Sequence, residues 1–153
     1  IKHFERNGEW RFERICSGEC IEEAKAFVDK FYQEKNDPDL ANEAKAIEEM
    51  FGHYEELGFI GGLLYQSGQP VAFTAGTRLG DEVFDTHFEK ALPGVEGAYT
   101  MVNREFARLV TAEYPEIRYF NREEDMGIPG LRTAKESYYP AFKLRKFYGV
   151  CKC

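Results

Sequence analysis

The sequence lacks the long apolar segments of membrane proteins and secreted precursors. It contains no run of about 18 apolar residues, so no membrane span is predicted. No basic segment is followed by an apolar one, so no signal peptide is predicted either. The chain also begins with Ile1 rather than Met and reads like the middle of a longer chain. We therefore expect a cytoplasmic protein whose N-terminal portion is missing.

An excess of basic residues is lacking too. The 20 Lys and Arg residues against 27 Asp and Glu give a net charge of −7, which argues against a surface that coats nucleic acid. The charge is uneven, because residues 118–153 carry eight basic and four acidic side chains and residues 1–117 hold the remaining −11. A basic C-terminal third suits a phosphate-bearing ligand held in one place, and a solvated basic face is the alternative.

The usual zinc motifs are also lacking. The four cysteines, Cys16, Cys20, Cys151 and Cys153, form C-x3-C and C-x-C pairs at opposite ends of the chain, with no histidine beside either pair. These spacings differ from the C-x2-C of zinc knuckles. We predict ordinary cytosolic thiols and no metal, with a zinc-stapled structural domain as the weaker alternative.

The length of 153 residues and the hydrophobic content of 43% predict a single α/β domain over residues 1–153. Apolar alternation predicts strands and apolar stripes at helical spacing predict helices. The predicted strands are 10–15, 59–65, 71–77, 83–91, 117–120 and 141–148, and the predicted helices cover 21–32, 38–51, 99–114 and a short stretch from 131. An antiparallel meander followed by β-α-β-α-β implies a mixed, mostly antiparallel sheet with helices on both faces.

The predicted strand 83–91 has one wet face. Phe84 and Phe88 are expected on one side, and Asp85, His87 and Glu89 on the other. The three polar residues could line a cleft or supply a general base. Three ligands on one strand lie nearly in line, which suits a tetrahedral metal poorly, so no metal is predicted. A solvated strand face is the alternative.

A glycine-bearing loop, residues 92–98, joins that strand to the next helix. Gly94, Gly97, Ala98 and Tyr99 would offer backbone N–H groups at a helix N-terminus, where anions bind. This loop is our candidate phosphate site, and a plain turn is the alternative.

Residues 121–138, called here the charged loop, follow the predicted strand 117–120. Pro129-Gly130 can form the turn that starts a short helix. Polar groups at the end of a strand, before a helix N-terminus, are typical of ligand sites in α/β proteins.

The charged loop mixes acids and bases. Arg122, Arg132 and Lys135 can hold a phosphate or a carboxylate, and Glu123 and Asp125 an ammonium group. This mixture favours a zwitterionic ligand such as an amino acid. The alternative is an internal ion-pair network that braces the loop.

The element order resembles the GNAT N-acetyltransferase fold, and several motifs are more specific. They are Glu89-Lys90-Ala91, Gly97-Ala98-Tyr99, Asn103-Arg104-Glu105-Phe106, the block from Asn121 to Pro140, and Lys146-Phe147-Tyr148. Together they resemble the phosphatidylglycerol lysyltransferase C-terminal domain family over about residues 10–149. That family includes domains that move an aminoacyl group from charged tRNA to a lipid headgroup, and soluble proteins built of two GNAT-like halves. The resemblance implies that this chain is the C-terminal half of a soluble member.

The resemblance also implies roles for particular residues. Glu89 is the preferred general base, Asp125 the second candidate, and Tyr138 the acid that protonates the leaving group, with Tyr139 beside it. Asn103 and Asn121 lie in the motifs and are predicted to contact the ligand.

Two hypotheses follow for the function. The first is an acyl- or aminoacyl-transferase that uses acyl-CoA or aminoacyl-tRNA as donor, a small amine or hydroxyl compound as acceptor, and no tightly bound cofactor. The second is a non-catalytic module that binds an amino acid or another small anion. Leu92-Pro93 stands where the acetyltransferase loop has a basic residue, which favours the second reading slightly. The sequence does not identify the donor, the acceptor or the oligomeric state.

Overall fold

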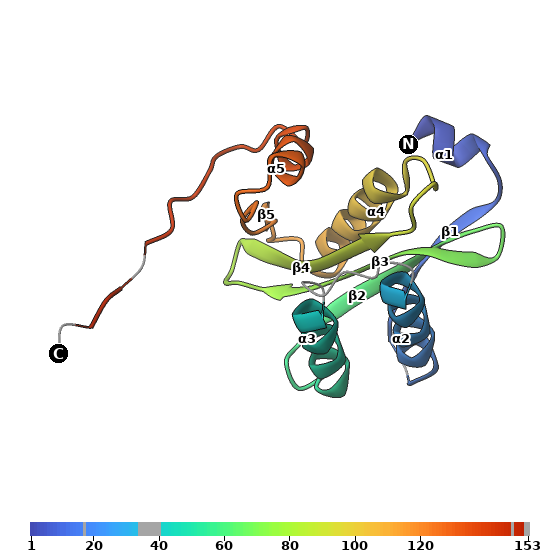
Figure 1. Ribbon diagram of the computed structural model, residues 1–153, viewed down its shortest axis with the longest axis horizontal. Coiled ribbons are helices and arrows are strands. Elements are labelled where there is room, and N and C mark those ends of the chain that lie inside the picture. The colour runs from blue at the N-terminus through green and yellow to red at the C-terminus, as the bar shows by residue number, and fades with distance from the viewer. Residues whose placement is uncertain (17, 34–40, 148, 152–153) are drawn as a thin grey trace. The chain divides into compact units, whose positions relative to one another are not determined.

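The computed structural model describes residues 1–16, 18–33, 41–147 and 149–151 (Figure 1). The chain divides into two compact units, Ile1–Asn121 and Arg122–Cys153. Each unit is described by itself below. The division of residues 1–153 into domains stays a prediction.

The first unit is built on a five-stranded sheet with the order β1-β2-β3-β4-β5. All neighbouring strands are antiparallel except β4 and β5, which are parallel. The strands are β1 (Trp10–Arg14), β2 (Ile60–Gln66), β3 (Gln69–Arg78), β4 (Val83–Ala91) and β5 (Tyr119–Asn121). The mixed, mostly antiparallel sheet predicted from the sequence is confirmed.

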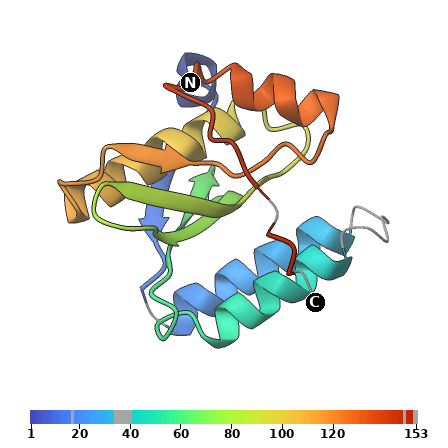
Figure 2. The ribbon, with the colours of Figure 1, turned by 90° about the vertical axis from the view of Figure 1, so that its left-hand side faces the viewer.

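Helices cover both faces of this sheet (Figure 2). The helices of the first unit are α1 (Lys2–Arg6), α2 (Gly18–Gln33), α3 (Ala41–Gly52) and α4 (Ala98–Glu113). Helices α2 and α3 lie on one face, where their apolar stripes join Leu63 and Phe73 in one core cluster. Helix α4 lies on the other face with α1, and Phe4 of α1 is completely buried there against Ala98 and Met101.

Steric constraints explain why glycine occupies certain positions in β2 and in the β2–β3 turn. Ser67 and Gly68 both have positive φ, as a two-residue hairpin turn requires. A Cβ on Gly62 would lie 2.2 Å from the ring of Phe12 in β1. Gly62 therefore lets the Phe12 ring pack directly against the backbone of β2.

A β-bulge in β4 changes which side chains share a face. Ala75 pairs with Phe88 and Gly76 pairs with Thr86, so His87 is an extra residue in β4. As a result Phe84 packs on the α4 face and Phe88 packs against the α2–α3 cluster. The prediction that these two phenylalanines lie on one side is wrong, because alternation was counted through the bulge.

Three further predictions differ from the structure. Helix α1 was not predicted, because five residues are too few to show a helical period. Strand β5 starts two residues later than predicted, since Ile117 closes the turn after α4 with its N–H bonded to Tyr114. The described residues 141–147 form no strand, although their sequence alternates. Phe142, Leu144 and Phe147 are exposed there, so the apolar side of the alternation is not buried as it would be in a strand of a packed sheet.

The described residues of the second unit form one short helix, α5 (Pro129–Glu136). The predicted short helix is present, but it begins at Pro129 and not at Leu131, because the fixed φ of proline suits the first turn of a helix. The sequence Asp37-Pro38 predicts the cap and the first position of the second long helix, but both residues lie outside the described part of the chain. None of the helices in the described part of the chain is long and apolar enough to cross a membrane.

Candidate functional site

The first unit exposes an edge of β4 that has no partner strand. Strand β5 pairs with β4 only through Val83, Phe84 and Asp85 and then ends at Asn121. Beyond that point, no strand among the described residues pairs with the side of β4 that faces away from β3. The N–H and C=O groups along this edge can bind an extended ligand as an added strand would. This edge could not be predicted from the sequence, because it depends on how far β5 pairs with β4.

Glu89 lies on the α4 face of β4. Its Oε2 accepts a hydrogen bond from Nδ2 of Asn103 in α4, at 3.3 Å, and the side chain is half-buried. Asn103 was predicted to contact a ligand, and the structure places it as the residue that orients Glu89. An oriented, half-buried carboxylate beside an open strand edge can accept a proton from a nucleophile.

Asp85 and His87 lie apart from Glu89 because of the bulge. Asp85 is buried, with 8% of its surface exposed, and accepts a hydrogen bond from Nδ2 of Asn121 at 3.0 Å. The ring of His87 packs 5.5 Å from that of Phe59, on the α2–α3 face, and its Nε2 lies 2.9 Å from Oγ1 of Thr77. The three residues do not form the single wet face that was predicted. Asn121, another predicted ligand contact, links β5 to β4, and its contact with a ligand stays a prediction.

A polar group formed by Lys90, Glu43 and Tyr32 lies on the α2–α3 face and was not predicted. Nζ of Lys90 lies 2.5 Å from Oε1 of Glu43 in α3, and the hydroxyl of Tyr32 in α2 donates to Oε2 of Glu43 at 2.7 Å. The side chain of Lys90 is only 16% exposed and that of Glu43 33%. Lys90 stands in the Glu89-Lys90-Ala91 motif, which was the available signal, but only the fold brings α2 and α3 to it.

Tyr99, in the first turn of α4, lies at the end of the strand edge and within electrostatic range of Glu43. Its hydroxyl accepts a hydrogen bond from the backbone N–H of Ala91, the last residue of β4. Burial of the hydroxyl raises the pKa of Tyr99, the Ala91 N–H partly offsets this rise, and the carboxylates of Glu89 and Glu43 raise the pKa further. Burial, followed by the bond to Glu43, also raises the pKa of Tyr32. Both phenols therefore stay protonated at neutral pH and can donate.

The glycine loop has the backbone of an anion site. Gly94 and Gly97 have φ of 84° and 83°, in the left-handed region that favours glycine. Among the described residues, the N–H groups of Gly94, Gly97 and Tyr99 have no backbone acceptor, while that of Ala98 bonds to Val95. Exposed N–H groups at the N-terminus of α4 favour an anion.

The side chains around this loop do not reinforce an anion site. Residues 92–97 contain no Lys or Arg, and Glu96 pairs with His3 of α1 at 3.2 Å. A Cβ on Gly97 would lie 3.4 Å from Cβ of Phe4, so α1 covers one side of the loop. Any anion here would depend on backbone amides alone.

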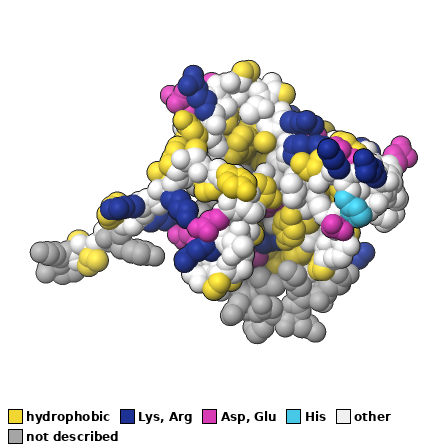
Figure 3. Space-filling view, turned by 90° about the horizontal axis from the view of Figure 1, so that it is seen from above, with side chains coloured by type: hydrophobic (Ala, Val, Ile, Leu, Met, Phe, Trp, Pro, Cys, Tyr) yellow, Lys and Arg dark blue, Asp and Glu magenta, His cyan; other side chains and the backbone are white. Residues whose placement is uncertain are grey.

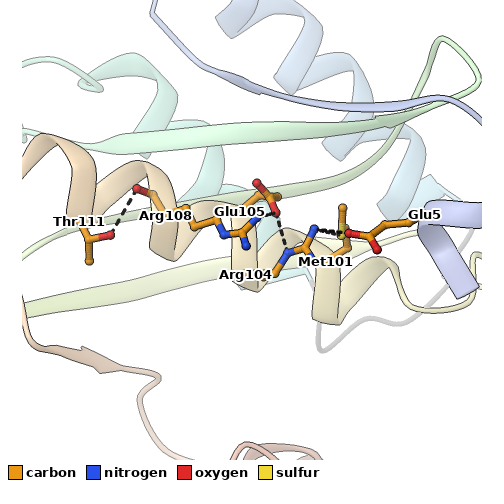
Figure 4. A network of polar contacts seen from close by, with 6 residues as sticks. All are labelled: Glu5, Met101, Arg104, Glu105, Arg108 and Thr111. Carbon is orange, nitrogen blue, oxygen red and sulfur yellow. Dashed lines mark hydrogen bonds and ion pairs between the residues drawn. The ribbon is translucent and has the colours of Figure 1, made fainter. Parts of the chain in front are cut away.

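Helix α1 is tied to α4 by a network around Arg104 (Figure 4). Nη2 of Arg104 lies 2.8 Å from Oε1 of Glu5, and its Nε 2.6 Å from Oε1 of Glu105. Arg108 also binds Glu105, at 3.0 Å. These ion pairs hold α1 in place beside the loop, and their cations are engaged in doing so.

In the second unit, Asp125 is held by its neighbours. Arg132 binds both carboxylate oxygens, at 2.5 and 3.2 Å, and the N–H of Gly127 donates to Oδ1 at 2.9 Å. The hydrogen bonds from Arg132, then from Gly127, lower the pKa of Asp125 to about 2. A carboxylate with so low a pKa is a poor general base, which leaves Glu89 as the better candidate.

The other cations of the charged loop also bind within it. Nζ of Lys135 donates to the backbone carbonyls of Arg122 and Glu124. The guanidinium of Arg122 lies 4.5 Å from the ring centre of Tyr138. Glu123 has a φ of 52°, in the left-handed region, so the backbone turns sharply there. The loop is thus braced internally, as the alternative reading supposed, and the roles of these residues toward a ligand stay predictions.

No continuous basic surface is visible on the face drawn in Figure 3. Lys and Arg side chains lie there among acidic and hydrophobic ones. This mixture agrees with the net charge of −7.

Comparison with solved structures identifies the fold. A conserved protein of unknown function from Bacteroides thetaiotaomicron matches with a TM-score of 0.84 and 34% identity, over 92% of this chain and 48% of that one. The chain therefore spans about half the length of this relative. The aminoglycoside N-acetyltransferase AAC(6')-Iy in complex with CoA matches with a TM-score of 0.62 and 11% identity, over 97% of this chain and 98% of that one. An aminoglycoside 6'-N-acetyltransferase from Acinetobacter haemolyticus matches with a TM-score of 0.60 and 15% identity, over 94% and 98%.

These acetyltransferases show that the fold is of the GNAT type, as predicted. No functionally curated protein matches the sequence. The family described as "Phosphatidylglycerol lysyltransferase, C-terminal" matches residues 1–149, nearly the whole chain. The chain belongs to the phosphatidylglycerol lysyltransferase C-terminal family.

Proposed function

We propose that this chain transfers an acyl or aminoacyl group from a thioester or ester donor to an amine or hydroxyl acceptor. The observation that carries the proposal is the unpaired edge of β4, which runs to Ala91 and ends beside the N-terminus of α4. An amide-bearing donor can bind along the edge, and its phosphate at the N–H groups of Gly94 and Gly97. The reacting carbonyl would then lie near Glu89.

Glu89 acts as the general base in this proposal. It takes a proton from the attacking amine or hydroxyl, whose lone pair forms the new bond to the carbonyl carbon. The tetrahedral intermediate collapses when the bond to the donor sulfur or oxygen breaks, and the leaving group takes up a proton. Tyr138 remains the predicted source of that proton. Asn103 holds the Glu89 carboxylate in one orientation, so catalysis depends mainly on positioning.

The donor is either acyl-CoA or aminoacyl-tRNA. The solved AAC(6')-Iy complex contains CoA, which supports the first on grounds of fold. The family name refers to lysyl transfer, which supports the second. A charged tRNA partner, an N-terminal GNAT-like half and a cytoplasmic location are parts of the same proposal.

A second candidate function is a non-catalytic module that binds a small anion or an amino acid. The absence of Lys and Arg from residues 92–97, together with Glu96, favours it, because a pyrophosphate would gain no ion pair there.

Calorimetry and transfer assays separate the two functions. Wild-type protein is titrated with acetyl-CoA, with a charged-tRNA mimic and with a free amino acid, and transfer to an amine is then followed by mass spectrometry. The proposal expects binding of one donor, and a loss of about 100-fold in transfer rate for Glu89→Gln. Glu113→Gln, an exposed position at the other end of α4, should leave the rate unchanged. Binding of the free amino acid but of neither donor would establish the second function instead.

A further inference from the structure

The polar group formed by Tyr32, Glu43 and Lys90 does more than join two helices to a strand. Taking a lysine and a glutamate out of water costs several kcal/mol, and an apolar pair of similar volume would hold α3 to β4 at least as well. Here the Lys90 side chain is 16% exposed and Glu43 33%, so the pair is largely removed from water and still reachable from it. A partly buried ion pair that solvent can reach is suited to meeting a ligand.

This group contains hydrogen-bond donors whose hydrogens no described residue accepts. The Lys90 ammonium has three donor hydrogens, and Glu43 is its one partner among the described residues. The Tyr99 hydroxyl accepts from the Ala91 N–H, so its own hydrogen is directed elsewhere. Glu43 acts on the Tyr99 hydroxyl electrostatically, and Tyr99 acts likewise on Tyr32, so the phenol lies within electrostatic range of the same group. An ammonium and a phenol at the C-terminal end of β4 therefore offer hydrogen bonds that no described residue accepts.

The charges nearby select the kind of ligand. Lys90 and Glu43 cancel each other, and Glu89 on the neighbouring position adds a negative charge. The carboxylates of Glu43 and Glu89 repel any anion, and they repel a phosphate dianion more strongly than a singly charged carboxylate, which two good donors can bind.

We infer that Lys90 and Tyr99, held by Glu43, Tyr32 and the Ala91 N–H, form a subsite for a carboxylate group of the acceptor. The acceptor is then an amine that also carries a carboxylate, such as an amino acid or a short peptide. That the bound molecule is the acceptor of the transfer rests on the proposed function. Binding of its carboxylate to the subsite does not require transfer.

Glu43 is the positioning residue of this subsite. It orients the Lys90 ammonium and bonds to Tyr32, so its removal would free the lysine to turn away. Replacement of Glu43 by Gln should therefore weaken carboxylate binding less than loss of Lys90 does.

Titration of the 153-residue chain without any acyl donor tests the subsite. The amide signal of Ala91 is the reporter, since its N–H bonds to Tyr99. L-alanine should shift this signal saturably, and L-alaninamide, which lacks the carboxylate, should bind at least about tenfold more weakly. Lys90→Met should weaken the binding of L-alanine by at least about tenfold, and Tyr99→Phe should weaken it by a smaller factor. Lys25→Met, which removes an exposed lysine paired with Glu22 in α2, should change nothing.

Several results would overturn the subsite. These are equal binding of L-alanine and L-alaninamide, unchanged binding in Lys90→Met, tighter binding of inorganic phosphate, or no saturable shift with L-alanine. Should Lys90→Met fail to fold, Tyr99→Phe decides, because it keeps the ring and removes only the donor. Binding of L-alanine without transfer in the assays above would support the subsite and contradict the proposed function. Transfer to simple amines with no preference for a carboxylate would do the reverse.

Discussion

Two regions of this chain hold acids and bases close together, and they use them differently. In the charged loop of the second unit, Asp125 has two bonds from Arg132, and Lys135 donates to two backbone carbonyls. At the end of β4 in the first unit, Lys90 has one partner among the described residues and the Tyr99 hydroxyl keeps its hydrogen. The loop uses its charges to fold, and the strand end has donors to offer.

The difference shows that charge density alone does not indicate a binding site. The charged loop is the most conspicuous polar stretch in the sequence, yet its side chains bind one another or the loop's own backbone. The helix of this segment, α5, has no buried residue. A segment without apolar burial must be ordered by hydrogen bonds and ion pairs. Apolar clusters on both faces order the sheet of the first unit, so its polar side chains are not needed to hold the fold.

The largest effect is expected from breaking the bulge that separates the faces of β4. A Cβ on Gly76 would lie 2.1 Å from the backbone oxygen of Asp85, which cannot move without disturbing the strand. We expect Gly76→Ala to lower the free energy of unfolding by about 3 kcal/mol, measured by urea denaturation. Gly52→Ala, where nothing lies within 4 Å, is the control and should change it by less than about 1 kcal/mol. Equal effects would show that the bulge is not sterically fixed.

A smaller effect is expected from the ion pair at the end of β4. A double-mutant cycle with Lys90→Met and Glu43→Gln should give a coupling free energy of about 1 kcal/mol, because the pair is largely shielded from water. The exposed pair Lys25–Glu22 should give less than about 0.5 kcal/mol in the same cycle. A coupling energy for Lys90–Glu43 no larger than that of the exposed pair would contradict the partly buried geometry.

The smallest effect is local and concerns acid. The bonds from Arg132 and Gly127 lower the pKa of Asp125 from 3.8 to about 2. This interaction is therefore fully present above about pH 4 and is lost as the pH falls toward 2. We expect the amide signal of Gly127 to titrate with a midpoint near 2, and the low-pH step to vanish in Asp125→Asn. A midpoint near 3.8 would mean that Arg132 does not hold the carboxylate.

Much of the fold could be predicted from the sequence, because local signals agree with it. The apolar stripes of α2, α3 and α4 and the turn at Ser67-Gly68 are visible in the chain. The bulge at His87 could not be predicted, since it depends on the pairing between β3 and β4. The alternation of residues 141–147 was misleading, because a strand also needs a partner.

The candidate site was predicted only in part. Glu89 and Tyr99 were chosen from their motifs, and the structure adds what holds them, Asn103 and the Ala91 N–H. Lys90 stood next to Glu89 in the sequence but gave no sign of its role. Its partner Glu43, and Tyr32, which binds Glu43, lie more than forty residues from Lys90 along the chain, so only the packing of α2 and α3 on β4 brings them together.

The most direct test of the account compares Glu89→Gln with Asp125→Asn in the same transfer assay. The account places the base on β4, so Glu89→Gln should reduce the rate by about 100-fold, and Asp125→Asn by less than about threefold. Circular dichroism should show that both variants keep the wild-type fold. The opposite order, with Asp125→Asn as the inactive variant, would contradict the account and move the chemistry to the charged loop.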